Sequence, residues 1–174
     1  MEKVIMDKKA IDLVLNRMAY EIMEGYRYGE ICLVGIRTNG VPLAERLATI
    51  ISEKHNITVL TGVLDITLYR DDLINNPRIP ELKSTDLRFD VNGKNIVLVD
   101  DVLFTGRTAH AALCAIMEYG RPDSVKFAVL IDRGHRELPI SADFAGKKVV
   151  TLYNEKIDVK LSETDGTDMV TVKN

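Results

Sequence analysis

Hydrophobic positions alternate between helical and strand spacing along the first part of the chain. From Asp7 to about Gly25 apolar residues recur at helical spacing, and Asp7 is a candidate N-cap. The apolar run ICLVGI at residues 31–36 predicts a buried strand. A second helix is expected to start near Pro42, because proline suits the first turn of a helix. The next segment, 57–70, alternates more loosely and predicts one long or bulged strand.

The same alternation continues further along the chain. The runs NIVLVDD (95–101) and SVKFAVLID (124–132) predict two more buried strands. Between them, residues 107–120 show helical spacing, and Gly120 is expected to close that helix. After residue 132 the pattern changes to short strands and turns, with strands expected at 147–153, 156–163 and 168–173.

The segment 71–93 shows neither pattern. It is polar and is interrupted by Pro77 and Pro80. A segment of this length without an element of its own is more often a functional lid than a passive connection, so we expect a flexible loop at about 71–92.

Strand–helix alternation with continuously apolar strands predicts an α/β fold with a mostly parallel sheet that is flanked by helices. Such sheets bind ligands outside the carboxyl ends of their strands. Four polar clusters follow the expected strands: RTNG (37–40), YRDD (69–72), DDVLFTGRT (100–108) and DRGHRE (132–137). Their convergence on one edge of the sheet predicts a single binding site.

Composition narrows the class of protein. The chain has 174 residues, of which 46% are hydrophobic and 28% charged, values ordinary for one soluble domain spanning 1–174. The net charge of -3 gives no global attraction to nucleic acid, so any RNA face must be a local patch. Cys32 and Cys114 lie in apolar runs and are interpreted as small buried side chains in a reducing cytoplasm. We expect neither a signal peptide nor a membrane span.

The stretch VLVDDVLFTGRT carries the clearest chemistry. Thr105, Gly106, Arg107 and Thr108 lie where the chain turns into a helix, and backbone N–H groups there favour a phosphate. Asp100 and Asp101 are acceptors when ionised, so they suit a sugar diol or a metal-bound sugar. Together they favour a ribose 5-phosphate. The alternative is that the acids only end a strand and that Thr105 only caps a helix.

Other phosphate motifs are missing. The chain has neither the P-loop pattern G-x-x-x-x-G-K-[ST] nor a G-x-G-x-x-G after a strand. A phosphoacceptor receiver domain has its paired acids after the first strand, whereas Asp100 and Asp101 come in the middle of this chain.

The stretch VLVDDVLFTGRT resembles the phosphoribosyl-diphosphate signature of the type I phosphoribosyltransferases. The segments 65–73, 97–113 and 120–147 narrow the resemblance to the PyrR family of bacterial pyrimidine-operon regulators. These are RNA-binding attenuators that also have uracil phosphoribosyltransferase activity. The resemblance covers nearly the whole chain, and the segment DRGHRELPI is specific to this subfamily.

The resemblance implies a role for each matching residue. Asp100 and Asp101 would hold the ribose hydroxyls directly or through Mg²⁺, and the diphosphate would meet Arg37 and, as a lid closes, Arg70. A hood at about 132–160, with Asp132 and Arg133, would receive the pyrimidine. The full set of expected substrate-binding residues is Arg37, Thr38, Asn39, Gly40, Tyr69, Arg70, Asp100, Asp101, Val102, Leu103, Phe104, Thr105, Gly106, Arg107, Thr108, Asp132 and Arg133.

The implied reaction joins uracil to phosphoribosyl diphosphate and gives UMP and pyrophosphate. Arg70 and Asp101 are the candidate catalytic residues. The alternatives are that Asp101 only binds ligand and that His135 is a structural hydrogen-bonding residue. Such a reaction depends on positioning, charge and exclusion of water more than on a covalent nucleophile. An orotate or purine substrate is a more distant alternative, because the signature alone does not fix the base.

The resemblance also implies an RNA face with Arg17, Arg136, Lys147 and Lys148, UMP as effector, and a homodimer or larger oligomer. The chain departs from the family at Ser141 and Asn39, where arginine is usual, and at Tyr20, where histidine is often found. Each lost cation removes a phosphate contact. Two hypotheses therefore stay open: a regulator that binds pyrimidine-operon leader RNA, and a salvage enzyme with weakened RNA binding.

Overall fold

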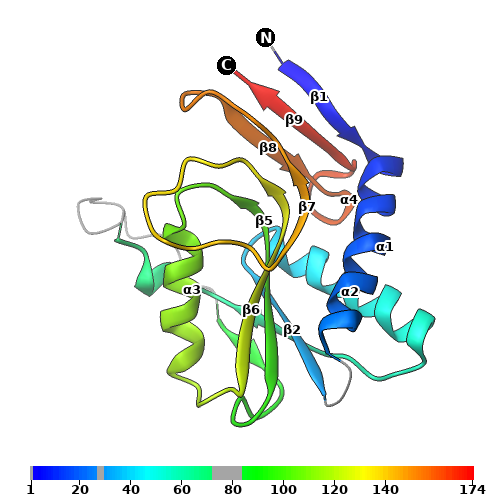
Figure 1. The fold of residues 1–174 in the computed structure, drawn as a ribbon, viewed down its shortest axis with the longest axis vertical. Coiled ribbons are helices and arrows are strands. Elements are labelled where there is room, and N and C mark those ends of the chain that lie inside the picture. Colours follow the sequence, from blue (N-terminus) through cyan, green and yellow to red (C-terminus); the bar gives the residue numbers. More distant parts are fainter. Residues whose placement is uncertain (1, 27–29, 72–83) are drawn as a thin grey trace.

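The chain forms two sheets, which Figure 1 shows one above the other. The structure is a computed structural model that describes residues 2–26, 30–71 and 84–174. The larger sheet has six strands in the order β4-β3-β2-β5-β6-β7. Its strands are β2 (Ile31–Ile36), β3 (Leu60–Leu64), β4 (Asp86–Leu87), β5 (Asn95–Leu103), β6 (Ser124–Asp132) and β7 (Phe144–Lys148). All neighbours pair in parallel except β4, which runs antiparallel to β3 at the edge. The predicted fold class is confirmed.

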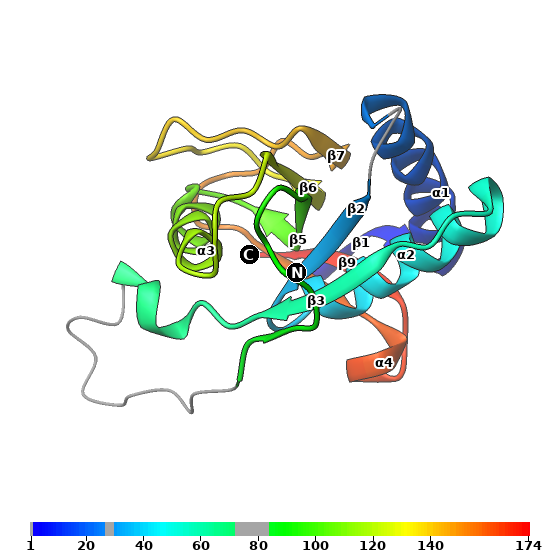
Figure 2. The same ribbon diagram turned by 90° about the horizontal axis from the view of Figure 1, so that it is seen from below.

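Helices cover both faces of the large sheet. Figure 2 shows α1 (Lys8–Gly25) and α2 (Gly40–His55) on one side and α3 (Arg107–Met117) on the other. The core is accordingly divided into two clusters, one under α1 and α2 and one under α3. Every residue of β2 is buried, as its uninterrupted apolar sequence predicts. The side chain of Asp7 accepts a hydrogen bond of 2.8 Å from the backbone N–H of Ala10, which confirms the predicted N-cap of α1.

The small sheet consists of three antiparallel strands in the order β1-β9-β8. They are β1 (Glu2–Asp7), β8 (Lys156–Lys160) and β9 (Met169–Lys173), so the two ends of the described chain pair with each other. The short helix α4 (Ser162–Asp165) connects β8 to β9. No strand was expected at residues 2–7, because its partner β9 lies at the other end of the sequence.

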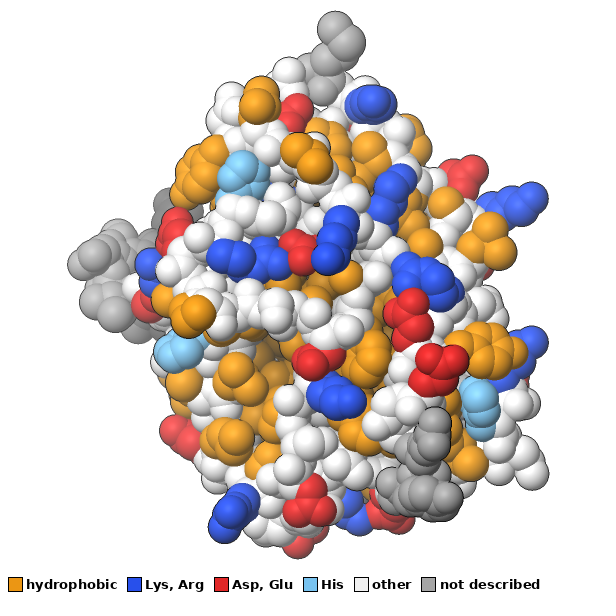
Figure 3. Space-filling model, in the orientation of Figure 1, with side chains coloured by type: hydrophobic (Ala, Val, Ile, Leu, Met, Phe, Trp, Pro, Cys, Tyr) orange, Lys and Arg blue, Asp and Glu red, His pale blue; other side chains and the backbone are white. Residues whose placement is uncertain are grey.

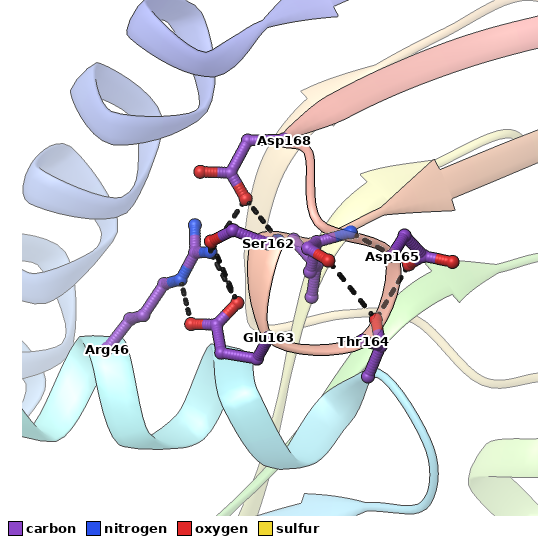
Figure 4. A network of polar contacts seen from close by, with 7 residues as sticks. Arg46, Ser162, Glu163, Thr164, Asp165 and Asp168 are labelled. Atoms are coloured by element: carbon purple, nitrogen blue, oxygen red, sulfur yellow. Dashed lines mark hydrogen bonds and ion pairs between the residues drawn. The ribbon is translucent and has the colours of Figure 1, made fainter.

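A polar network around Arg46 joins α2 to the turn between β8 and β9 (Figure 4). The guanidinium donates to both carboxylate oxygens of Glu163, at 2.7 and 2.6 Å, and to Asp168 at 2.7 Å. It also donates to the hydroxyl of Ser162 at 2.9 Å, and Asp168 accepts the backbone N–H of the same serine. These contacts fix the small sheet to α2, a helix that packs on the large sheet.

Three expected elements differ from the structure. The long strand predicted at 57–70 is wrong: β3 ends at Leu64, and a 3-10 helix, η1 (Thr67–Tyr69), follows. The carboxylate of Asp65 accepts from both the backbone N–H and the hydroxyl of Thr67, a local turn that competes with sheet pairing. The strand expected at 147–153 is also misplaced, because β7 covers Phe144–Lys148 and no strand follows it before β8. The third helix ends at Met117, before Gly120.

A hood and a flexible loop were predicted from the sequence as residue ranges. The hood was expected at 132–160, but β7 within that range belongs to the large sheet, and the small sheet takes in β1 and β9 as well. Of the loop predicted at 71–92, residues 72–83 lie outside the described residues, and its mobility stays a prediction. The rest of that range contains β4 and the buried side chain of Val91.

One burial prediction is also wrong. Cys32 is fully buried, but Cys114 is exposed. The buried face of α3 is formed by alanines and Ile116, and Cys114 points away from it, close to His110 one turn earlier. Within the described ranges, none of the helices combines the length and apolar character needed to cross a membrane.

Candidate phosphoribosyl-binding site

The four polar clusters lie at one edge of the large sheet. Because β2, β3, β5 and β6 pair in parallel, the segments that follow them leave the sheet on the same side. Two hydrogen bonds and an ion pair join the clusters directly: Asn39 donates to Asp101, Arg107 pairs with Asp71, and Arg136 donates to the carbonyl of Phe104. The predicted convergence is therefore confirmed for the described residues.

Asp100 and Asp101 lie near the carboxyl end of β5. Asp100 is only 6% exposed and accepts the backbone N–H of Asp101 at 2.9 Å. Burial raises the pKa of Asp100 well above its usual range, and the nearby charge of Asp101 raises it further, whereas the positive charge of Arg70 opposes both. An acid in this position is poised to bind a cation or hydroxyl hydrogens, since either would offset the cost of its buried charge.

The turn 103–108 wraps the N-terminus of α3. Gly106 is its N-cap with φ of 93°, in the left-handed region that favours glycine, and the hydroxyl of Thr105 accepts the N–H of Arg107 at a long 3.4 Å. A small cavity of about 100 Å³ lies inside this turn, between the sheet and the helix start. It is lined by Asp100, Val102, Leu103, Phe104, Thr105, Gly106, Thr108, Ala109 and Phe127. Backbone N–H groups at such a helix start form an anion site.

Arg107 takes a different position from the other residues of this turn. Its guanidinium pairs with Asp71 and with Glu137, the latter at 2.7 Å, and it does not line the cavity. The expected contact of the Arg107 side chain with the 5-phosphate therefore stays a prediction, whereas the structure joins it to the segments that follow β3 and β6.

The loop 37–40 packs tightly on the end of β5. A Cβ on Gly40 would lie 2.2 Å from the carbonyl oxygen of Val99, so only glycine fits there. The peptide bond between Arg37 and Thr38 is cis. The Arg37 guanidinium donates to the carbonyl of Ser84 at 3.1 Å, and its Nε is buried without a partner among the described residues. Asn39 faces Asp101, at 2.9 Å.

Tyr69 and Arg70, at the end of η1, interact with different parts of the protein. The hydroxyl of Tyr69 donates to Glu118 at 2.5 Å, at the end of α3 opposite to the phosphate turn, and this bond is the main cause that raises the pKa of Tyr69 to about 12. Arg70 instead acts electrostatically on Asp100. The charge of Arg70 thus acts on the acidic pair, whereas the hydroxyl of Tyr69 is turned away from the turn at 103–108.

The segment after β6 folds over the phosphate turn. Asp132 pairs with Arg136 at 2.6 Å and accepts the N–H of Gly134. Arg133 is only 6% exposed; its guanidinium lies 4.0 Å from the centre of the Phe104 ring and donates to the carbonyl of Leu152 at 3.0 Å. An open cavity of about 420 Å³ lies here, lined by Asp132, Arg133, Gly134, His135, Arg136, Lys148, Val149, Val150 and Thr151.

An aromatic cluster beside this cavity was missed in the sequence. Phe104, His135 and Tyr153 meet with ring centres 5.4 to 5.9 Å apart. The Nε2 of His135 contacts the carbonyl oxygen of Thr151 at 2.7 Å, which supports its structural interpretation. Tyr153 also donates to Glu137 at 3.2 Å. Tyr153 was missed because its segment was assigned to a strand, and only its aromatic side chain in a polar stretch could have signalled it.

The expected RNA-binding residues follow β7 and the elements beside it. Arg17 on α1 donates to backbone carbonyls of β7, and Lys147 donates to the carbonyl of Ile5, so these two lie together. Lys148 lies beside Asp132. Arg136 lines the same cavity as Lys148, and its guanidinium donates to Phe104, Gly134, Ile140 and Asp132. On the face in Figure 3, blue basic side chains are interspersed with red acidic ones.

The acids fit a magnesium ion that arrives with its substrate. Among the described residues, no cluster of three or more His, Cys, Asp or Glu side chains could hold a metal. Mg²⁺ is commonly bound by one or two carboxylates together with substrate phosphates and water. Asp100 and Asp101, one buried and one half-buried, supply the carboxylates for such an arrangement.

Comparison with known proteins identifies the class of this protein. A model of the phosphoribosyl transferase domain family matches residues 3–164. A hypoxanthine-guanine phosphoribosyltransferase from Bacillus anthracis has the same fold, with a TM-score of 0.76 at 18% identity over 99% of this chain and 98% of that one. A hypoxanthine phosphoribosyl transferase from Trypanosoma cruzi also has a TM-score of 0.76, at 18% identity over 99% and 91% of the two chains. The fold and the family model define a protein of the phosphoribosyltransferase class.

Curated relatives narrow the class. The chain is 54% identical to a protein of Pelotomaculum thermopropionicum over 97% of this chain and 93% of that protein. It is 53% identical to one from Chloroflexus aurantiacus, over 98% and 94% of the two chains. Both are named Bifunctional protein PyrR. The chain therefore belongs to the PyrR family of phosphoribosyltransferases, which confirms the predicted resemblance.

Proposed function

We propose that the protein is a uracil phosphoribosyltransferase that also acts as a UMP-dependent, RNA-binding regulator of pyrimidine genes. The observation that carries the enzymatic part is the placement of Asp100 and Asp101 beside the N-terminus of α3, at the edge where all four polar clusters meet. Names of relatives support the second role, because they are called bifunctional.

Each part of phosphoribosyl diphosphate has a suitable partner in this site. The 5-phosphate fits the turn from Thr105 to Thr108, where backbone N–H groups and the helix dipole favour an anion. The ribose hydroxyls would donate to Asp100 and Asp101. The diphosphate would lie between the loop at 37–40 and Arg70, whose charge already acts on Asp100 in the free protein.

The reaction is a displacement at the anomeric carbon. A bond forms between N1 of uracil and C1′ of the ribose, the bond from C1′ to the diphosphate oxygen breaks, and N1 loses its proton. Mg²⁺, when bound with the substrate, would stabilise charge on the leaving diphosphate. The protein's own residues hold the two reactants in line and exclude water, with Arg70 placed to balance the charge of the departing group.

The base would occupy the open cavity next to residues 132–136. Its wall combines Asp132 and backbone groups with the ring of His135, which packs on Phe104, a mixture that suits a flat, hydrogen-bonding pyrimidine. The test is release of pyrophosphate from phosphoribosyl diphosphate with Mg²⁺ and uracil, orotate or hypoxanthine. We expect release with uracil. Release with orotate or hypoxanthine alone would overturn this assignment.

The acidic pair offers the sharpest test of the site. Asp101→Asn removes the charge while keeping the shape, and we expect kcat/KM to fall at least about tenfold, equivalent to roughly 1.4 kcal/mol of transition-state stabilisation. Asp12→Asn is the matched control, because Asp12 is exposed on α1 far from the site. Unchanged kinetics in the Asp101 variant would mean that the pair only ends a strand.

A second candidate function is a salvage enzyme with weakened RNA binding. Asn39 carries no charge, and its amide is hydrogen-bonded to Asp101 and Val159. The guanidinium of Arg136 makes four hydrogen bonds within the protein. Filter binding with a pyrimidine-operon leader hairpin, with and without UMP, separates the two candidates. UMP-dependent binding at physiological salt supports the regulator, and uracil turnover without such binding supports the salvage enzyme.

We further propose that the protein works in the cytoplasm, where its cysteines stay reduced, as a homodimer or larger homo-oligomer. Cys32 and Cys114 form no disulfide in the structure. Sedimentation of the purified protein measures the oligomer size, and a monomer at all concentrations would contradict the second part.

A further inference from the structure

Asn39 joins three parts of the site through one side-chain amide. Its Nδ2 donates to Oδ2 of Asp101 at 2.9 Å and to the carbonyl oxygen of Val159 at 3.0 Å. Asn39 belongs to the loop after β2, Asp101 to β5, and Val159 to β8 of the small sheet. Both partners are acceptors, so the nitrogen of the amide, and not its oxygen, must face them.

The position of this amide is fixed on every side. Its own backbone leads directly into Gly40, which packs on Val99 so closely that no Cβ would fit. The carbonyl of Val159 is held in place because its strand, β8, pairs with β9. The hydrogen bond to this carbonyl therefore keeps the amide of Asn39 from turning. The remaining N–H is therefore held in one direction, toward Asp101.

Asp101 has a physical need for such a donor. Its backbone N–H donates to the side chain of the buried Asp100 at 2.9 Å, so the two carboxylates stand close together and a donor from another element helps to orient Asp101. A bond from Asn39 to Oδ2 stabilises the charge and leaves Oδ1 of Asp101 without a bond to this amide. Hydrogen bonds to a charged group are stronger than neutral ones, which makes this restraint effective.

We propose that Asn39 is a positioning residue that orients Asp101 for the ribose of phosphoribosyl diphosphate and couples this orientation to the small sheet. The inference rests on the proposed function for the identity of the ligand. It goes beyond that function because it assigns to Asn39 a role through Asp101, instead of a contact with the diphosphate.

Binding of phosphoribosyl diphosphate with Mg²⁺, measured by calorimetry without any base, tests this role. Asn39→Leu keeps the approximate shape and removes both donors, and we expect the dissociation constant to rise at least about fivefold, the effect of losing one bond to a charged group. In the turnover assay KM for phosphoribosyl diphosphate should rise in parallel, whereas KM for uracil should stay within about twofold. Asn39→Asp, which replaces the donor by an acceptor of equal shape, should act in the same direction if the leucine variant does not fold.

Asn16→Leu is the matched control. Asn16 also donates an amide hydrogen to a backbone carbonyl, that of Asp12, but on the exposed side of α1. Equal affinity in wild type and in the Asn39 variants overturns the inference alone. A wild type that does not bind phosphoribosyl diphosphate overturns both this inference and the proposed function. A fall in Tm with equal changes in both KM values would show a purely structural role and would also overturn it.

Discussion

At the scale of single residues, the site buries an acidic side chain where little water can stabilise its charge. Asp100 is nearly inaccessible and stands next to a second acid, and its pKa is raised by burial first and by Asp101 second. The free protein therefore carries a cost in stability that a bound cation or a ribose would remove. This arrangement is common where binding and not folding has determined the residue.

Asp100→Asn should therefore make the free protein more stable and less active. Because the folded protein binds the Asp100 proton more tightly than the unfolded chain does, wild-type stability falls as pH rises through the raised pKa. The variant lacks this titration, so its gain in the free energy of unfolding should be largest at about pH 8 and should shrink as pH falls toward the ordinary pKa of an aspartate, about 3.9. Urea unfolding across this pH range measures the effect, and kcat/KM should fall at least about tenfold.

The control for this prediction is Asp12→Asn, an exposed aspartate on α1. It should change neither the pH dependence of unfolding nor turnover. A variant at Asp100 that is less stable than wild type at pH 8 would contradict the interpretation of a buried, costly charge.

At the scale of elements, the contact between α2 and the β8–β9 turn holds the small sheet in place. Asp168 is only 9% exposed, and its pKa is lowered because the hydrogen bond from Arg46 and the N–H of Ser162 outweigh the opposing effect of burial. Glu163 also has a lowered pKa, chiefly through Arg46. Since Val159 and Asn39 share a bond, this anchor indirectly supports the site.

Arg46→Met should destabilise the protein by about 2–4 kcal/mol, because it leaves a buried carboxylate without its cation. A carboxylate whose pKa is lowered by folding stabilises the folded state at pH values above its pKa in the unfolded chain. That contribution disappears as pH falls through its pKa in the folded protein. The difference between wild type and variant should therefore be full at pH 7 and smaller near pH 3. Denaturant unfolding at both pH values measures it.

Arg88→Met is the matched control for this ion pair. Arg88 pairs with Asp86 at 2.9 Å, but its side chain is 82% exposed, so its loss should change stability far less than the loss of Arg46. Equal effects of the two substitutions would mean that the Arg46 network is no stronger than an ordinary surface pair.

At the scale of the whole molecule, charge is the feature that separates the two candidate functions. The chain has a net charge of -3, and two of its expected RNA-binding cations are engaged within the protein, since Arg17 donates to carbonyls of β7 and Arg136 pairs with Asp132. Ser141 is exposed where the family usually has an arginine. Phosphate contacts dominate the affinity of proteins for nucleic acids, so these losses should weaken RNA binding.

Ser141→Arg should tighten binding of a pyrimidine-operon leader hairpin. It should steepen the plot of log K against log salt by about 0.7, the value for one added phosphate contact on single-stranded RNA. Uracil turnover should stay nearly unchanged, because Ser141 does not line the cavities at the acidic pair or beside residues 132–136. Ser141→Gln adds length without charge and should leave the salt slope as in wild type. Nanomolar, UMP-dependent binding by the wild type would contradict weakened regulation.

The sequence by itself determined the large sheet and the place of the site. Continuous apolar runs give strands buried on both faces, and parallel pairing then brings Arg37, Arg70, Asp100 and Asp132 to one edge. The resemblance of residues 97–108 to a phosphoribosyl-diphosphate signature gave the family, which the comparisons confirm. These features could be predicted because they depend on local patterns of a few residues each.

Only the tertiary structure decided how the small sheet forms and how the site residues are held. The strand β1 has no partner nearby in the sequence, since β9 lies at the opposite end of the chain. Asn39 was interpreted as a lost cation, whereas the structure shows an amide that bonds Asp101 and Val159. Arg107 and Tyr153 meet through Glu137, and Cys114 faces solvent. Contacts between residues so far apart in sequence leave no periodic signal, because they depend on where the packed strands and helices place each side chain.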